Sequence, residues 1–172
     1  MTSFRSFWAV CLFAPALAFA GGGPFNVLVV VNTNSANSVE LGDYYAAAHG
    51  IPARQICAVG IDTNWGSITY TQFRNGLRNP IYNHIAANGL SNQIDYVVFC
   101  QDFPTRIEDT EGIGASLFYG FKNAPRYVEE GCNLPLDATN EFYLAERAFR
   151  SADGWNGTNG FIAFHLIASN LP

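Results

Sequence analysis

Three short apolar runs alternate with stretches of helical periodicity over the first hundred residues of the chain. The first and third runs are apolar on both sides of the backbone, which is typical of strands covered on both faces of a parallel sheet. The alternation predicts an α/β fold, with a three-layer, mainly parallel sheet and helices on both faces, in a flavodoxin-like or caspase-like arrangement. The predicted strands are residues 27–31, 56–61 and 94–100.

The stretch between the first two runs predicts a helix. Asn37 followed by Glu40 has the form of a capping box, which places the start of the helix there. Gly50 suits the left-handed position after the last turn, with Ile51 as the hydrophobic follower and Pro52 as the stop. The apolar side chains at helical spacing are Leu41, Tyr44, Tyr45 and Ala48.

A second helical stretch has an apolar residue at every fourth position. Pro80 lies within it, and a proline ring collides with the carbonyl four residues earlier, so the pattern predicts two helices rather than one. Asn79 is the expected cap of the second helix, with Pro80 in its first turn and Gly89 at its end. The apolar positions are Phe73, Leu77, Ile81 and Ile85.

The last third of the chain has a weaker pattern. Residues 101–106 are a predicted loop, 112–121 a short helix, and 141–149 a helical stretch in a region rich in Gly, Pro, Asn and acidic residues. Residues 161–168 are a predicted fourth strand. A strand so close to the last residue has no helix after it, so we expect either an edge strand or, by preference, the N-terminal part of a longer protein.

The first twenty residues predict a secretory signal peptide. Arg5 gives a positive start, residues 7–17 form an apolar run, and residues 18–20 provide a small-x-small cleavage site. The run is shorter than the ~20 apolar residues of a membrane-spanning helix, and no later run is long enough. Residues 21–172 are therefore expected to form a single α/β domain, periplasmic or extracellular, without a transmembrane segment.

Composition and charge narrow the range of partners. Apolar residues make up 49% of the chain, which is enough for a hydrophobic core. The net charge is −5, and the nine Lys and Arg residues are scattered along the sequence. Nucleic acids and acidic membrane surfaces require concentrated positive charge, so the sequence argues against both as partners.

The segment 27–52, which contains "VVVNTNSANSVELGDYYAAAHGIP", resembles an uncharacterised family of exported bacterial proteins from species that carry the exosortase sorting system. Further similarity lies in "RNPI" at 78–81, "IDYVVF" from 94 and "FPTRI" at 103–107. The resemblance implies a secreted α/β protein, usually longer than this chain. It implies no established activity and no catalytic residues. Residues 165–168 depart from the family pattern, which has an Arg-Leu-Asp-Gly-like segment there.

Loss of the leader would leave three cysteines, Cys57, Cys100 and Cys132. An odd number permits at most one internal disulfide and leaves one thiol unpaired. Cys57 and Cys100 lie in strand-like runs, where a free cysteine behaves as a small hydrophobic residue. Cys132 lies in a predicted loop and is expected to be the exposed one. The sequence leaves the pairing open.

Candidate ligand-binding residues follow from the predicted sheet. In an open parallel sheet, ligands bind beyond the carboxyl ends of the strands, where the crossover direction reverses. The start of the first helix adds free N–H groups and partial positive charge, which favour a carboxylate or phosphate. The alternative is structural, since Asn and Ser also supply the hydrogen bonds of a strand-to-helix turn. The residues expected at this rim are Asn34, Ser35, Asp62, Asp102, Thr105 and Arg106.

Nucleophilic catalysis has weak support. Caspase- and gingipain-like peptidases place a His after one central strand and a Cys after the next, so that the imidazole activates the thiol. Cys100 ends the third predicted strand, but the loop after it has no His. We expect His49 at a helix end, His84 on a solvated helix surface and His165 in the core. No GxSxG motif of a serine hydrolase is present.

Cofactor and metal motifs are also weak. The loop after the first strand lacks the glycines of a phosphate loop, so no cofactor is expected. The acidic stretches 108–111 and 129–130 lack the spacing of a known calcium loop, and no metal is expected. We therefore expect an extracytoplasmic, non-catalytic surface or binding module, associated with the cell surface or matrix. The alternative is a fragment of a secreted hydrolase of the caspase/gingipain-like type.

Overall fold

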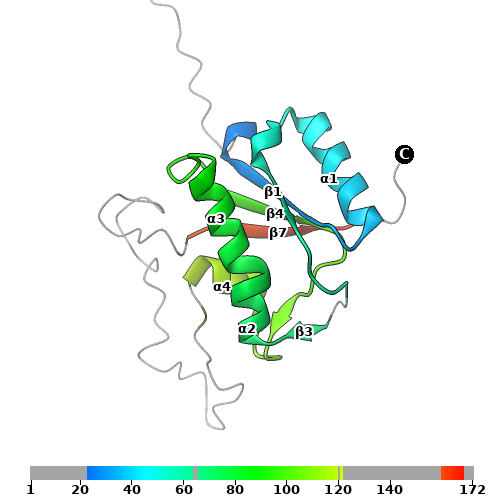
Figure 1. The fold of residues 1–172 in the computed structure, drawn as a ribbon, viewed down its shortest axis with the longest axis vertical. Helices are drawn as coiled ribbons and strands as arrows, with labels where there is room; N and C mark the ends of the chain where they lie inside the picture. Colours follow the sequence, from blue (N-terminus) through cyan, green and yellow to red (C-terminus); the bar gives the residue numbers. More distant parts are fainter. Residues whose placement is uncertain (1–22, 64–65, 120, 122–159, 169–172) are drawn as a thin grey trace, which may run out of the picture.

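The computed structural model describes residues 23–63, 66–119, 121 and 160–168. Its main sheet has four strands in the order β2-β1-β4-β7, and every neighbouring pair is parallel. This is the 2-1-3-4 order of the flavodoxin-like arrangement. The predicted parallel α/β fold is confirmed (Figure 1). The strands are β1 (Val27–Asn32), β2 (Ile56–Val59), β4 (Tyr96–Cys100) and β7 (Ile162–Leu166).

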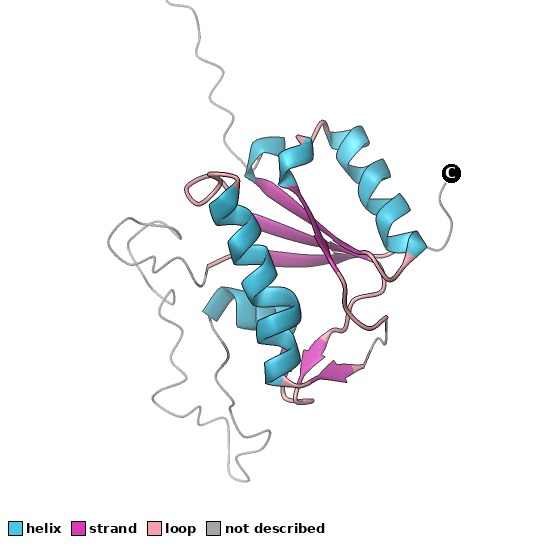
Figure 2. Ribbon diagram, viewed as in Figure 1, coloured by secondary structure: helices cyan, strands magenta, loops and turns pink. Residues whose placement is uncertain are grey.

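Helices cover both faces of the main sheet, which gives three layers (Figures 1 and 2). Alternate residues of β1 point into two separate cores, with Leu28 and Val30 on one side and Val29 and Val31 on the other. Helix α1 covers the side of Val29 and Val31, whereas the remaining helices cover the opposite side. These elements are α1 (Ala36–His49), α2 (Tyr70–Gln72), the π-helix η3 (Phe73–Arg78), α3 (Asn79–Ala87) and α4 (Ile113–Tyr119).

Helix α1 begins two residues earlier than the sequence predicts. Its N-cap is Ser35, whose extended backbone and side chain, accepting from the Ser38 N–H, replace the predicted capping box at Asn37. The predicted C-terminal cap is confirmed, since Gly50 has φ 65° and the Ile51 N–H donates to the Ala46 carbonyl. Of the predicted apolar positions, Leu41 is buried, whereas Tyr44 and Ala48 are exposed.

The second helical stretch is continuous through Pro80, but the type of helix changes there. The α-helix α3 begins at Asn79, so Pro80 lies in its first turn as predicted, whereas Asn79 itself has helical backbone angles and is not the cap. The π-helix η3 directly precedes this proline, and the Asn79 N–H donates to the Arg74 carbonyl five residues earlier. The wider π turn accommodates a residue that cannot donate a hydrogen bond. The predicted apolar face and the end at Gly89 are confirmed. The buried side chains of that face are Phe73, Leu77, Ile81 and Ile85.

A second, three-stranded sheet lies beside the main one and was not predicted. It consists of β3 (Ser67–Ile68), β5 (Arg106–Ile107) and β6 (Glu111–Gly112), in the order β3-β5-β6. Strands of two residues are too short to produce an alternating pattern. The turn between β5 and β6 has positive φ at two non-glycine residues, Glu108 and Asp109.

Among the described residues, β7 is the outermost strand on its side of the main sheet, next to β4. Phe164 pairs with Val98, a residue on the α1 side of the sheet, and is 52% exposed, so this edge presents an aromatic side chain to solvent. His165 is also exposed, and its predicted place in the core is wrong, because an edge strand is not enclosed on both sides. The predicted helical stretch 141–149 and Cys132 lie outside the described residues.

Two short 3-10 helices, η1 (Pro24–Asn26) and η2 (Ala53–Gln55), precede β1 and β2. They lie at the amino ends of the strands, opposite the rim where the candidate residues lie. Among the described residues, no helix is long and apolar enough to cross a membrane.

Candidate functional site

The candidate site lies where β1 and β4 run side by side and their crossovers diverge. From β1 the chain passes through α1, on one face, to β2, and from β2 it returns through α3, on the other face, to β4. This divergence is the topological switch point at which open α/β sheets bind ligands. The loop after β1 meets the loop after β4 there.

Asn32, the last residue of β1, holds the two loops together and was not among the predicted site residues. It is fully buried, and its Nδ2 donates to the Asp102 carbonyl at 2.8 Å. Its Oδ1 accepts from the backbone N–H groups of Asn34, at 3.1 Å, and Ile61, at 3.3 Å. The loops after three strands therefore share this one amide. A polar residue at the end of a buried apolar run was the available signal in the sequence.

Ser35 and Asp102 form the closest side-chain contact of the site. The Ser35 hydroxyl donates to Oδ2 of Asp102 at 2.5 Å and accepts from the Ser38 N–H at 3.1 Å. Ser35 is only 7% exposed. A carboxylate of the chain itself therefore lies at the positive end of α1, where the sequence predicted an external carboxylate or phosphate.

The backbone around this contact is also constrained. Asp102 has φ 63°, a left-handed conformation that Asp tolerates better than most residues. The Ser38 hydroxyl accepts from the Asn32 N–H at 2.9 Å and donates to the Cys100 carbonyl at 3.0 Å, so it bridges β1 and β4. A side chain from the first turn of α1 thus satisfies backbone hydrogen-bonding groups at the ends of β1 and β4.

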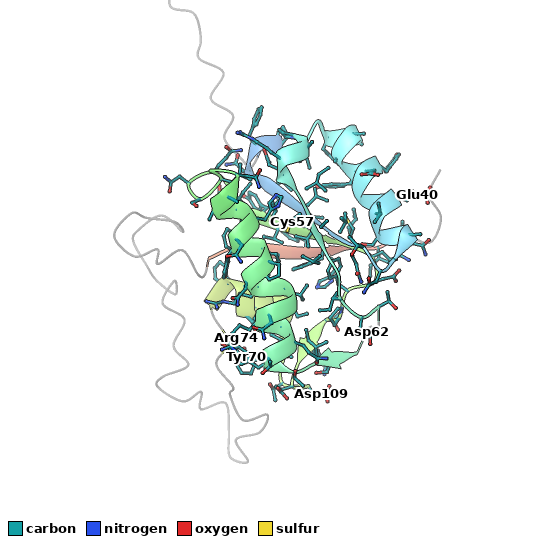
Figure 3. All side chains as sticks on the ribbon, viewed as in Figure 1. Glu40, Cys57, Asp62, Tyr70, Arg74 and Asp109 are labelled. Atoms are coloured by element: carbon teal, nitrogen blue, oxygen red, sulfur yellow. The ribbon has the colours of Figure 1, made fainter. Side chains whose placement is uncertain are left out.

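The structure brings four of the six predicted residues to the switch point. Asn34 and Asp62 join Ser35 and Asp102, because Nδ2 of Asn34 donates to the carbonyl of Ile61, next to Asp62, at 3.1 Å. Asp62 is exposed and lies on the loop that runs from β2 towards β3 (Figure 3).

The other two predicted residues, Thr105 and Arg106, are placed by the small sheet. The Thr105 N–H donates to the Gly66 carbonyl at 3.3 Å, and its carbonyl accepts from Ile113 at 3.1 Å. Arg106 pairs with Ser67 on one side and with Gly112 on the other, and its side chain is exposed.

The cysteines lie in the two cores on opposite faces of the sheet. Cys57 is 2% exposed and packs between the sheet and α3 (Figure 3), and Cys100 is fully buried under α1. Burial raises the pKa of each thiol to about 12, and the negative charge of Asp43 adds to the rise for Cys100. Both thiols are free, a point that the sequence left open, and both are protonated at neutral pH.

No imidazole of the described part of the chain is placed to activate Cys100. His165 pairs with Phe99 across β4 and β7, and the two rings stack with centroids 5.3 Å apart. Phe99 and Cys100 are consecutive strand residues and point to opposite faces, so the His165 ring and the Cys100 thiol are separated by the sheet. Partial burial lowers the pKa of His165.

The other two histidines serve local contacts. Nε2 of His84 lies 2.9 Å from the Arg54 carbonyl, and the ring of His49 lies 4.4 Å from that of Tyr45 between centroids. Within the described ranges, no three His, Cys, Asp or Glu side chains are close enough together to hold a metal ion.

Comparisons with protein-family models, with curated proteins and with solved structures found no match to this chain.

Proposed function

We propose that this chain is an exported, non-catalytic α/β module that acts as a surface or binding protein outside the cytoplasm. Export is supported by the sequence of residues 1–20 and by the resemblance of residues 27–107 to an exported bacterial family. Association with the cell surface or matrix is part of the same proposal.

The absence of catalysis is supported above all by the separation of Cys100 from His165. A cysteine nucleophile requires a base within hydrogen-bonding reach, or another cause of a lowered pKa. Here the sheet separates the thiol from the imidazole, and burial raises the pKa of Cys100 instead of lowering it. A thiol with a pKa of about 12 carries almost no thiolate at neutral pH.

The hydrogen bonds of the switch point support the same proposal. Asn32 and Ser35 are buried and bonded within the chain, so they are engaged in holding the loops. A ligand that used either side chain would have to displace an internal bond, and an unsatisfied buried polar group costs about 1–3 kcal/mol. The exposed side chains that remain at this rim are Thr33, Asn34, Asp62 and Thr63.

Thiol labelling tests whether Cys100 is a reactive nucleophile, as the hydrolase alternative requires. The chain from Gly21 onward, with Cys132→Ser, retains only Cys57 and Cys100, and it is treated with iodoacetamide at pH 7.5 with and without denaturant. We expect both thiols to react in the unfolded chain and neither in the folded chain. Rapid alkylation of Cys100 in the folded chain, with Cys57 protected, would instead favour the secreted hydrolase fragment.

Fractionation tests export. The full chain is expressed in a Gram-negative host, and the N-terminus of the protein recovered outside the cytoplasm is sequenced. We expect it to begin at Gly21. Retention of an intact chain in the cytoplasm would contradict the proposal.

A further inference from the structure

We propose that the outer edge of β7 is a dimer interface, at which the same strand of a second copy of this chain pairs antiparallel to it. β7 is the outermost described strand on its side of the main sheet (Figure 1). The edge of a sheet presents unpaired backbone groups that another strand can bind. The interface consists of residues 164–168, the β7 edge.

The backbone groups of the β7 edge point alternately towards β4 and away from it. The Leu166 carbonyl accepts from the Gln101 N–H at 2.9 Å, and the Ala168 N–H donates to the Gln101 side chain at 3.4 Å, so these groups face β4. Alternate residues of a strand direct their hydrogen-bonding groups to opposite sides. Within the described residues, no group bonds to the outward N–H and C=O of His165 and Ile167.

The geometry of the strand determines where the twofold axis lies. The preceding outward residue, Ala163, is bordered by α4, since a Cβ on Gly114 would lie 3.5 Å from the Ala163 carbonyl oxygen. The open part of the edge is therefore centred on Leu166. A twofold axis there places His165 opposite the partner's Ile167, and the two residues exchange both of their backbone hydrogen bonds.

The same pairing covers an exposed apolar side chain on each face of the sheet. Phe164 is 52% exposed and Ile167 58% exposed, and they lie on opposite faces because their positions in the strand differ by an odd number. Phe164 would lie opposite the partner's Ala168, and Ile167 opposite the partner's His165. Cross-strand contacts of this kind stabilise antiparallel pairs.

The charge distribution favours a second copy as the partner. Residues 160–168 contain no Asp, Glu, Lys or Arg, although the whole chain has a net charge of −5. Two identical negative chains therefore repel each other least along this segment. The opposite edge, β2, is flanked by the exposed side chains of Arg54 and Asp62, and charges of this kind protect an edge against pairing.

Sedimentation equilibrium tests the proposal. The chain from Gly21 onward carries Cys132→Ser, so that this thiol cannot link two copies, and it is measured from about 1 µM to 1 mM. We expect a monomer–dimer equilibrium with a dissociation constant of about 10–100 µM, because so short an edge buries a small area. A chain that stays monomeric over the whole range would overturn the proposal.

Two double variants test the position of the interface. His165→Glu with Ile167→Glu, and His165→Lys with Ile167→Lys, each place like charges opposite each other in the dimer. Each should raise the dissociation constant at least about tenfold, and an equimolar mixture of the two should form dimers again because opposite charges then meet. The control, Asn83→Glu with Ala86→Glu, adds the same charge to the exposed surface of α3 and should dimerise like the parent chain.

A third variant, Ile167→Pro, removes an outward N–H without changing a bond to β4, and it should also weaken the dimer at least about tenfold. Far-UV circular dichroism checks that each variant is folded. A dimer that persists in the folded variants would show that the copies meet elsewhere. A mixture of the Glu and Lys variants that stays monomeric would contradict the pairing of residue 165 with residue 167. Either result would overturn the proposal.

Discussion

Gly42 lies where α1 packs directly against β1, and we predict that Gly42→Ala destabilises the protein. A Cβ at this position would lie 2.2 Å from Cγ1 of Val31 and 3.5 Å from Sγ of Cys100. Val31 is β-branched and 4% exposed, so its side chain has no free rotamer to move into. The backbone of α1 or of β1 must therefore shift to accommodate the new methyl group.

Two opposing terms determine the size of the effect. Replacing Gly by Ala inside a helix gains about 1 kcal/mol of helix propensity. Overpacking a tight core costs about 1–3 kcal/mol, and a contact of 2.2 Å with a stiff residue belongs at the upper end of that range. We expect a net loss of about 1–2 kcal/mol in the free energy of unfolding.

A double-mutant cycle with Val31→Ala isolates the contact. Removing the Cγ1 atom leaves space for the methyl group, so in this background Gly42→Ala should stabilise the protein by about 1 kcal/mol. The coupling energy between the two positions is then about 2–3 kcal/mol. Urea denaturation followed by far-UV circular dichroism measures all four proteins. A Gly42→Ala protein more stable than the wild type, or a coupling energy near zero, would refute the close approach of α1 to β1.

Three further predictions concern the switch point, the thiols and the small sheet. Asn32→Ala should lower the free energy of unfolding by about 2–4 kcal/mol, because three internal hydrogen bonds are lost at a fully buried site. The control is Asn37→Ala, on the exposed surface of α1, which should change the free energy of unfolding by less than about 0.5 kcal/mol. Burial raises the pKa of Cys57 and Cys100 from 9.0 to about 12, so the unfolded chain loses these protons at lower pH than the folded chain. The free energy of unfolding should therefore fall between pH 9 and 12, by up to about 1.4 kcal/mol per pH unit for each thiol. Cys100→Ala should make this decline shallower, and an unchanged slope in alkaline denaturation curves would contradict the burial of its thiol. Asp109→Gly should raise the melting temperature, with a gain of about 0.5–1 kcal/mol, because Asp109 has φ 55° in the β5–β6 turn and glycine adopts such a conformation without strain.

Features that depend on a few neighbouring residues could be predicted from the sequence. The strands at residues 27–32 and 96–100 are long apolar runs, and burial on both faces follows directly from that pattern. The helix ends at Gly50 and Gly89 are similar cases, since a left-handed residue after the last turn requires only local chemistry. The parallel direction of the strands could be predicted from the alternation of strands with helices, because a helical crossover joins two parallel strands of one sheet and has one favoured hand.

Only the tertiary structure decided which polar groups meet at the end of the sheet. Asn32 and Asp102 are separated by seventy positions in the chain, and no local pattern relates an amide to a carbonyl at that distance. The contact of Ser35 with Asp102 also moved the start of α1, and the π turn at 73–78 carried the second helix through Pro80. Local propensity differs by about 1 kcal/mol or less between alternative starts of a helix or between most alternative helix types. Packing and hydrogen bonds between distant segments therefore determine which of them forms.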